Sequence, residues 1–399
     1  MKLVVQKYGG SSVADVDKIK LIAEQIAAIK KEGFDVVVVV SAMGKTTNQL
    51  IEMAKSISSD PPKREIDMLL STGERTTMAL LCIALDKLGV KAISLTGSQA
   101  GIITNDRYNE ARVIEVRPFR VQDELAKGQV VVIGGFQGVS YKRDITTLGR
   151  GGSDTSAVAL AAALNAERCE IYSDVDGVYT TDPNLIKDAK HLPELSYQQL
   201  QEMSEAGAKV LNAQAVQFAK EAKIVLHARS TFNPGNETVI RESPVLEKSD
   251  VLSVVYEKDI SRIFLHETEK VEWLLNFLNE NQIPVKEFHQ SGIAGDKGYK
   301  CSFIISTNNL YNWDNIKETL EENIREGIYI NESLSALSII GEGFNRNNSV
   351  LIKTLEILKQ NSIEIYGVNT TSFRISILVE RELLEFGVKV CHEFWIDKP

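Results

Sequence analysis

The chain has 399 residues, of which 43% are hydrophobic and 25% charged. This length exceeds what one hydrophobic core usually supports and the composition is that of a folded globular protein, so we expect at least two domains. With 45 basic and 54 acidic residues the net charge is -9, which argues against nonspecific binding to nucleic acid or anionic membranes. Any phosphate site must therefore be built locally.

The cysteines and the amino terminus indicate a reducing, cytoplasmic environment. Cys82, Cys169, Cys301 and Cys391 are far apart and form no CxxC or Cys/His pattern, so we interpret them as reduced thiols in the interior and expect no metal site. Residues 1–6 lack the layout of a secretory signal, and no stretch reaches the roughly 18 apolar residues of a membrane span. We expect no membrane association.

The first half of the sequence contains several buried strands. Residues 1–6 form a β-branched run that ends at two glycines. The runs at 36–40 and 130–133 are apolar without alternation, which is typical of strands covered on both faces in a parallel sheet. Shorter strands are expected at 92–95 and 170–173.

Helices are expected between these strands. Isoleucines at positions 19, 22, 26 and 29 recur at helical spacing, and further helices are expected at about 47–58 and 67–88. Ser153 is expected to cap an alanine-rich helix that runs to about Asn165. The alternation of strands and helices predicts an α/β sandwich with a mainly parallel sheet.

After the polar turn at 232–236 the pattern changes to helices that alternate with paired strands. The apolar and asparagine positions of 275–285 recur in 355–365, and strands are expected to follow at 301–306 and 373–379. This βαββ succession, appearing twice, predicts two small ferredoxin-like units. Two unrelated amphipathic helices with asparagine caps are the alternative.

A glycine turn follows the first strand, in the sequence Lys7-Tyr8-Gly9-Gly10-Ser11-Ser12. Free backbone N–H groups and the helix dipole favour an anion at such a place, glycines permit close approach, and Lys7 adds a positive charge. The common nucleotide patterns GxxxxGK[ST] and GxGxxG are absent. Because a glycine pair after a strand is also an ordinary turn, this feature alone leaves phosphate binding open.

The segment KYGGSSVAD at 7–15 resembles the opening motif of the aspartate kinases, which belong to the amino acid kinase superfamily. Further segments resemble motifs of the family in the same order: VSAMG at 40–44, STGER at 71–75, GGFQG at 134–138, TLGRGGSDT at 147–155 and YSDVDGVYTTDP at 172–183. The resemblance implies a three-layer amino acid kinase sandwich over residues 1–240. It also implies transfer of the ATP γ-phosphate to the side-chain carboxylate of L-aspartate, a step toward lysine, threonine and methionine or a specialised metabolite.

The resemblance implies catalytic roles for Lys7 and Asp154. The acceptor carboxylate has an ordinary pKa near 4, so it is ionised at neutral pH and needs no general base. The site must instead overcome repulsion between two anions and stabilise the transferring phosphoryl group. By resemblance Lys7 contacts that group and Asp154 orients Lys7. Without the motif, Asp154 would be an ordinary carboxylate in the first turn of a helix.

Four residues are implied to bind the amino-acid substrate. Arg150 would bind the α-carboxylate, for which a planar guanidinium is suited. Glu74 would receive the α-ammonium group, although a solvated helix residue is its ordinary interpretation. Ser41 and Thr47 would add hydroxyl contacts.

The resemblance also implies a set of ATP-binding residues, with Mg²⁺ as a second cofactor held largely by phosphates and water. Most lie beyond the carboxyl ends of predicted parallel strands, where such sheets bind ligands. The implied residues are Lys7, Gly9, Gly10, Ser11, Ser173, Asp174, Tyr179, Asp182 and Lys209. Lys209 would otherwise be an ordinary solvated lysine, and Asn184 and Gln214 replace basic residues common in the family.

The second half is similar in layout to the paired ACT domains of these kinases. The expected units are 250–333 and 334–399, the latter completed by a strand at 251–256. The loops at 266–270 and 344–349 lack the Pro-Gly of family effector sites, so we expect weak, absent or altered end-product inhibition. The ACT pair is still expected to form a homodimer.

Two other functions stay open from the sequence. A relative could phosphorylate another carboxylate, such as that of acetylglutamate or glutamate. A catalytically silent amino-acid sensor on the kinase fold is the alternative from a different class, although the presence of Lys7, Glu74, Arg150, Asp154 and Lys209 together argues against it.

Overall fold

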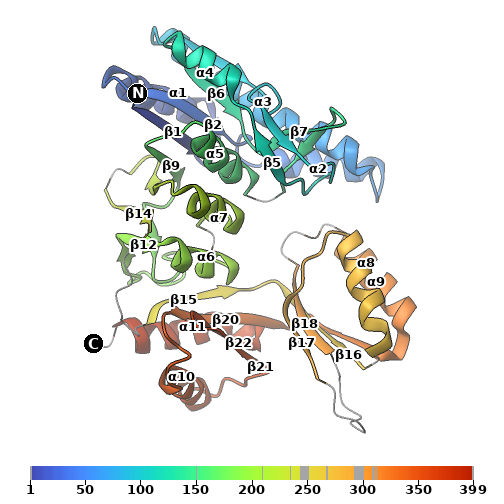
Figure 1. The fold of residues 1–399 in the computed structure, drawn as a ribbon. Helices are drawn as coiled ribbons and strands as arrows, with labels where there is room; N and C mark the ends of the chain where they lie inside the picture. The colour runs from blue at the N-terminus through green and yellow to red at the C-terminus, as the bar shows by residue number, and fades with distance from the viewer. Residues whose placement is uncertain are drawn as a thin grey trace. The chain divides into compact units, whose positions relative to one another are not determined.

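The computed structural model describes residues 2–149, 151–208, 210–233, 235–242, 251–266, 268–291, 301–307, 310 and 312–397 (Figure 1). The chain forms two compact units. The first contains Met1–Val178, His191–Ser204 and Lys209–Leu246, and the second contains Tyr179–Lys190, Glu205–Ala208 and Glu247–Pro399. Each unit is described separately below.

An eight-stranded sheet is the centre of the first unit, in the order β12-β14-β13-β9-β1-β2-β6-β3. Its strands are β1 (Leu3–Tyr8), β2 (Asp35–Val40), β3 (Ala92–Leu95), β6 (Val130–Gly134), β9 (Arg168–Ser173), β12 (Glu194–Ser196), β13 (Leu226–Ser230) and β14 (Glu237–Arg241). The six strands from β3 to β13 run parallel to their neighbours, whereas β14 is antiparallel to β13. The predicted mainly parallel sheet is therefore confirmed.

Helices cover both faces of this sheet, which gives three layers. The helices are α1 (Val16–Lys31), α2 (Thr46–Ile57), α3 (Lys63–Lys87), α4 (Phe119–Ala126), α5 (Gly152–Ala163), α6 (Tyr197–Glu205) and α7 (Ala213–Ala222). Helices α1 and α3 pack on one face, while α5 packs on β1, β2 and β9 and is itself covered by α7. Because α5 is enclosed in this way, nearly all of its residues are buried.

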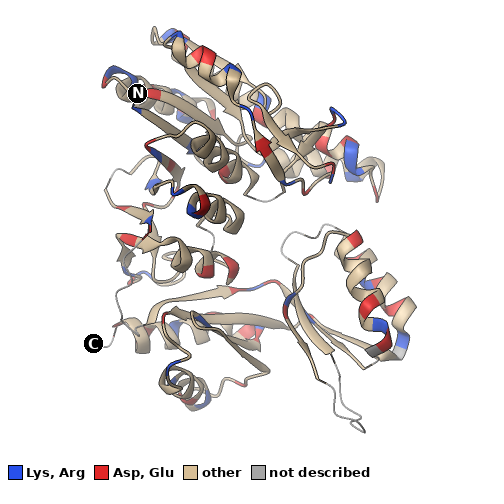
Figure 2. Cartoon of the chain, viewed as in Figure 1, with Lys and Arg blue, Asp and Glu red and all other residues tan. Residues whose placement is uncertain are grey.

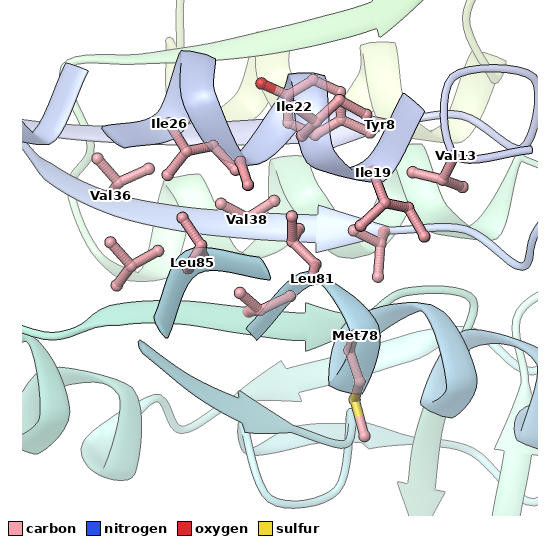
Figure 3. Close-up of a cluster of buried hydrophobic side chains, with 14 of the residues drawn as sticks. Tyr8, Val13, Ile19, Ile22, Ile26, Val36, Val38, Met78, Leu81 and Leu85 are labelled. Atoms are coloured by element: carbon pink, nitrogen blue, oxygen red, sulfur yellow. The ribbon is translucent and has the colours of Figure 1, made fainter. Parts of the chain in front are cut away.

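The core between the sheet and helices α1 and α3 is apolar (Figure 3). Ile19 and Ile22 from α1 contact Val38 from β2 and Leu81 from α3, and all four are at most 2% exposed. Burying such a side chain contributes about 1.5–3 kcal/mol relative to leaving it in water. The residues that alternate with these along the strands, such as Val39, are buried on the opposite face.

Helix α3 differs from its sequence prediction in one respect. Its 25 residues are long and apolar enough, by length and composition alone, to cross a membrane. From the sequence, no segment of the chain was expected to be long and apolar enough. In the structure its inner face contacts α1 and the sheet, and this face carries the buried acids Asp67 and Glu74. It is therefore the core helix of the first unit.

The start of α5 corrects a second prediction. Ser153 was expected to cap this helix, but the capping residue is Gly151, with φ 65° and no side-chain hydrogen bond, and Ser153 lies inside the first turn. A Cβ on Gly151 would lie 2.3 Å from Cβ of Asn212. Glycine is required here both by the left-handed backbone and by the approach of α7.

Two smaller sheets contain the other strands that occur between β3 and β12 in the sequence. One, in the order β5-β4-β7-β8, contains β4 (Ile102–Thr104), β5 (Val113–Val116), β7 (Gln137–Ser140) and β8 (Ile145–Thr147). The other is the pair β10 (Val178–Tyr179) and β11 (His191–Leu192). The first of these sheets leads the chain from β8 into the loop before α5.

The second unit contains two ferredoxin-like folds (Figure 1). The first runs β16 (Ile260–Leu265), α8 (Val271–Glu280), β17 (Lys286–Gln290), β18 (Cys301–Ser306), α9 (Trp313–Ile324) and β19 (Ile328–Asn331). Its antiparallel sheet has the order β17-β18-β16-β19. This is the βαββαβ succession that the sequence predicts.

The second fold runs β20 (Leu334–Gly341), α10 (Ser349–Gln360), β21 (Gly367–Thr370), β22 (Arg374–Glu380) and α11 (Leu384–His392). Its remaining strand is β15 (Val251–Glu257), which pairs antiparallel with β20 so that Val254 lies opposite Ile339. The sheet order is β15-β20-β22-β21. The predicted fold class, a mainly parallel α/β sandwich followed by two ferredoxin-like folds, is therefore confirmed.

The two ferredoxin-like folds have separate cores and share a small apolar contact. Ile260 and Ile304 from the first fold pack with Leu334, Ala336 and Leu378 from the second. Three of the four cysteines are buried as free thiols, and Cys82 is half-buried. Charged residues of both signs are distributed along the helices, and α9 is mainly acidic (Figure 2).

Candidate active site

The carboxyl ends of three parallel strands, β1, β2 and β9, lie at one edge of the large sheet. Lys7 on β1 lies beside Val39 of β2 and Ile171 of β9. The loops that follow are joined by backbone hydrogen bonds: Gly9 N donates to Tyr172 O at 3.2 Å, and Gly44 N donates to Gly10 O at 3.0 Å. Three of the sequence motifs are thereby brought to the same edge, where parallel sheets bind their ligands.

Lys7 and Asp154 form an ion pair at this edge. Lys7 Nζ lies 2.7 Å from Asp154 Oδ1, and the two side chains are only 13% and 10% exposed. Asp154 is in the first turn of α5, where the positive end of the helix dipole lies. Because breaking a buried pair leaves one charge uncompensated, each partner depends on the other or on a ligand that replaces it.

The glycine turn is packed closely against the loop after β2. A Cβ on Gly10 would lie 3.1 Å from Ala42 O and 3.2 Å from Gly44 O, whereas a Cβ on Gly9 would lie 3.5 Å from Lys7 Nζ. Ser11 is exposed and its carbonyl accepts a 2.9 Å hydrogen bond from Lys18 Nζ. Packing therefore favours glycine at position 10, whereas a Cβ at position 9 would make an ordinary contact with the ammonium group.

Glu74 points from α3 toward the same loop. It is 3% exposed, and its Oε1 accepts a 3.2 Å hydrogen bond from Ala42 N. Its Oε2 is buried and has no hydrogen-bond partner among the described residues. Burial raises the pKa of Glu74 to about 7, because the charged form loses its hydration. A buried carboxylate oxygen without a partner is suited to receive a cationic group of a ligand.

Ser41 and Thr47, whose hydroxyl groups are predicted to contact the amino-acid substrate, lie at the end of β2 and at the start of α2. Ser41 Oγ donates a 3.0 Å hydrogen bond to Ser153 Oγ, which joins the end of β2 to the first turn of α5. Thr47 is half-buried in the first turn of α2, next to Thr46, whose hydroxyl donates to Met43 O. Arg150, the predicted partner of the substrate carboxylate, lies outside the described residues.

The predicted ATP-binding residues are not all in one unit. Ser173 and Asp174 follow β9 in the first unit, where Asp174 is exposed and Ser173 Oγ accepts from Val175 N at 3.1 Å. Tyr179 and Asp182 belong to the second unit, where Asp182 Oδ2 accepts a 3.3 Å hydrogen bond from Tyr256. Lys209 lies outside the described residues.

Sequence reasoning missed Asp67, a fully buried acid on α3. Its Oδ1 accepts from Thr147 Oγ1 at 2.5 Å, its Oδ2 accepts from Thr147 N at 3.0 Å, and both oxygens accept from Asn109 N. Burial raises the pKa of Asp67 to about 6, although these hydrogen bonds lower it. The available signal was position, because an acid seven residues before Glu74 shares its helix face.

A second polar network was also missed, on the face of the sheet opposite α5. Fully buried Glu170 accepts from Gln6 Nε2 at 2.8 Å, from Arg168 Nε at 2.8 Å and from Arg229 Nη1 at 2.9 Å. Burial alone would raise the pKa of Glu170, but Gln6 and the two guanidinium groups hold it below its ordinary value. The network links β1, β9 and β13 directly behind Lys7.

No three His, Cys, Asp or Glu side chains come together as metal ligands within the part of the chain that the structure describes. Asp154, in the first turn of α5, is paired with Lys7.

Comparison with known proteins gives consistent results. The model of the amino acid kinase family matches residues 2–230. An aspartokinase of Bacillus sp. (strain MGA3) is 42% identical over 405 residues, which cover 98% of this chain and 97% of the relative. An aspartokinase of Geobacillus stearothermophilus is 39% identical over 398 residues, covering 98% and 97%.

A solved structure has the same fold. E. coli aspartokinase III, in complex with aspartate and ADP in the R-state, matches with a TM-score of 0.86 and 23% identity, covering 98% of this chain and 99% of that chain. At this identity the match supports the fold alone.

Proposed function

Because this chain belongs to the amino acid kinase family, as an aspartokinase, we propose that it transfers the γ-phosphoryl group of ATP to the side-chain carboxylate of L-aspartate. The product would be 4-phospho-L-aspartate. The observation that carries the proposal is the buried pair of Lys7 and Asp154, 2.7 Å apart at the carboxyl end of β1 and the start of α5.

The chemistry requires charge neutralisation more than proton transfer. The acceptor carboxylate has an ordinary pKa near 4 and is an anion at neutral pH, so it attacks without a general base. Lys7 would lie against the transferring phosphoryl group, where its ammonium offsets charge shared by the two reactants. Asp154 would hold that ammonium in place until the substrates bind.

The amino-acid pocket would be formed by residues from three loops and α3. Glu74 would receive the α-ammonium group, which is supported by its buried Oε2 without a partner among the described residues. Arg150 would bind the α-carboxylate, and Ser41 and Thr47 would donate hydroxyl contacts. A buried acid with a raised pKa becomes charged when an ammonium group binds beside it.

MgATP would be the second substrate. The backbone at Gly9, Gly10 and Ser11 would approach the phosphates, supported by the small clearance that disfavours a side chain at Gly10. Mg²⁺ would supply further neutralisation of phosphate charge when bound with the nucleotide. The residues proposed to complete the nucleotide site are Lys7, Ser173, Asp174, Tyr179, Asp182 and Lys209.

The second unit would be regulatory. We propose a catalytic domain at 1–240, followed by two ACT domains at 250–333 and 334–399. Residues 251–256 would complete the second ACT domain. Feedback inhibition would be weak, absent or altered, because the loops at 266–270 and 344–349 lack the Pro-Gly of family effector sites. In the second of these loops Phe344 is 8% exposed and packs in the apolar core. Strong inhibition by micromolar lysine plus threonine would contradict this.

We also propose that the protein works in the cytoplasm as a homodimer joined through the ACT domains. The aspartyl phosphate would feed synthesis of lysine, threonine and methionine, or a specialised metabolite. A mass measurement in solution by light scattering would test the dimer, and a monomeric mass would contradict it.

A hydroxamate-trapping assay tests the reaction. The full chain would be incubated with MgATP, hydroxylamine and one amino acid at a time, because only an acyl phosphate yields the coloured hydroxamate. We expect product with L-aspartate and little with glutamate or acetylglutamate. Product with another carboxylate would identify a different kinase. If no amino acid gave ATP-dependent product, a catalytically silent sensor would be favoured.

A further inference from the structure

Asp67 is a fully buried carboxylate that no described cation neutralises. Its donors are the backbone N–H groups of Asn109 and Thr147, the Thr147 hydroxyl and the Asn109 side-chain amide, whose nitrogen, in the orientation that satisfies both amide atoms, lies 2.7 Å from Asp67 Oδ1. No ion pair joins Asp67 to any residue that the structure describes. Burying a carboxylate is costly unless hydrogen bonds satisfy it. The donors converge on its two oxygens in an arrangement that asparagine cannot reproduce, because an amide presents one N–H face to those donors.

The partners of Asp67 are at the base of the loop that leads to α5. Thr147 is the last residue of β8, and its carbonyl accepts a 2.8 Å hydrogen bond from Ala111 N. The next residue, Leu148, donates its N–H to Phe136 O at 2.9 Å. Asp67 therefore fixes the point at which the chain leaves β8, seven residues before Asp154.

The same helix carries Glu74, two turns beyond Asp67 and on the same buried face. A displacement of Thr147 relative to α3 would therefore change the distance between the loop before α5 and the carboxylate of Glu74. Ser71, one of the buried residues between them, accepts through its carbonyl from Gln137 Nε2 at 3.1 Å. Helix α3 thus contacts the end of β8 through Asp67 and the loop after β2 through Glu74.

We propose that Asp67 is a positioning residue that sets the amino-acid pocket, by holding Thr147 and Leu148, where the chain leaves β8, in a fixed position relative to Glu74. The inference rests on the proposed reaction with aspartate. Asp67 touches neither substrate. Its effect is on the binding of the amino acid, and not on the phosphoryl group.

The test is the steady-state kinetics of Asp67→Asn in the full chain. We expect KM for aspartate to rise about tenfold to a hundredfold, since hydrogen bonds to charged groups carry effects of that size. KM for MgATP should change less than about twofold. The control is Glu124→Gln, which alters another buried acid of the first unit, on α4, that accepts from Lys127 and Gln129.

A second variant keeps the test decisive if Asp67→Asn folds poorly. Thr147→Val retains the branched shape and the backbone N–H but loses the 2.5 Å hydroxyl contact, and it should raise KM for aspartate in the same direction by less. A lower melting temperature with unchanged KM for aspartate, in either variant, would show that Asp67 only stabilises the fold and would overturn the proposal.

The proposed function and this inference fail in different ways. If wild type forms no hydroxamate with aspartate, the proposed function fails and the inference falls with it. If wild type is active on aspartate and both variants bind aspartate as wild type does, the function stands and the inference alone is wrong. Equal increases of KM for both substrates would also overturn it, since the pocket for aspartate would not be singled out.

Discussion

Replacing Lys7 by alanine tests the charge arrangement at the proposed reacting centre. The ammonium lies 2.7 Å from Asp154 Oδ1 and is 13% exposed, so water can replace it only in part. Removing a preorganised electrostatic contact at a reacting group costs about 10²–10³ in kcat, or about 2.7–4 kcal/mol. We expect Lys7→Ala to lose at least that much in hydroxamate formation.

The same substitution should also lower stability, because it leaves Asp154 buried without its partner. Breaking a buried pair on one side costs about 3–5 kcal/mol, and replacing both charges is often nearly neutral. We therefore expect the double variant Lys7→Ala with Asp154→Asn to regain most of the free energy of unfolding. It should not regain activity, because the lysine is still missing.

Urea unfolding and the trapping assay together separate the two effects. Activity should be measured at temperatures where circular dichroism shows each variant folded. A folded Lys7→Ala variant that keeps most of its kcat would refute the role of Lys7 at the phosphoryl group. A double variant with restored activity would show that the loss came from the unpaired carboxylate alone.

Three further predictions concern the first unit. Burial raises the pKa of Glu74 from 4.5 to about 7. Its contribution to the stability of the ligand-free protein, on the order of 3 kcal/mol, is therefore fully present below about pH 4.5 and is lost as pH rises through 7. The unfolding free energy of Glu74→Gln, measured against pH, should lack this decline, and parallel profiles for variant and wild type would contradict the prediction. Gly73→Ala should destabilise the protein by about 1–3 kcal/mol in urea unfolding, because the new Cβ would lie 2.7 Å from Cβ of Ala42. This cost should exceed the helix preference of alanine over glycine, about 1 kcal/mol. A raised melting temperature would show instead that the contact relaxes. Leu81→Ala, at a core position 1% exposed, should cost about 2–5 kcal/mol of unfolding free energy, and a loss below 1 kcal/mol would mean that the core collapses around the cavity.

The secondary structure of the chain was largely readable because its patterns are local. Unbroken apolar runs at 36–40 and 130–133 predicted β2 and β6, and the structure has them at Asp35–Val40 and Val130–Gly134. The strand predicted at 301–306 is β18 without change of bounds. The start of α5 was predicted wrongly, because a serine in the first turn suggests a cap whereas the close approach of α7 selects Gly151.

The candidate site was readable only in part. Motif resemblance identified Lys7 and Asp154, which the structure brings together, and Glu74, whose role stays a prediction. The only signal for buried Asp67 was its spacing of seven residues from Glu74, and Glu170 gave none, because an isolated acid in a helix or strand usually faces solvent. Their partners are 42 to 80 residues away for Asp67, and such distances are closed only by tertiary folding.

The sequence by itself determined the order of strands and helices, the change of pattern after the first 240 residues and the identity of the motifs, because apolar periodicity and turn chemistry act over a few residues. Tertiary structure decided which polar groups meet. Parallel pairing placed the ends of β1, β2 and β9 at one edge, and packing of α3 and α5 removed water from Glu74, Asp67 and Asp154. Burial, which no local pattern specifies, raises the pKa of Glu74 and Asp67. Folding also brings each carboxylate to its partner, Ala42 N for Glu74, Thr147 for Asp67 and Lys7 for Asp154.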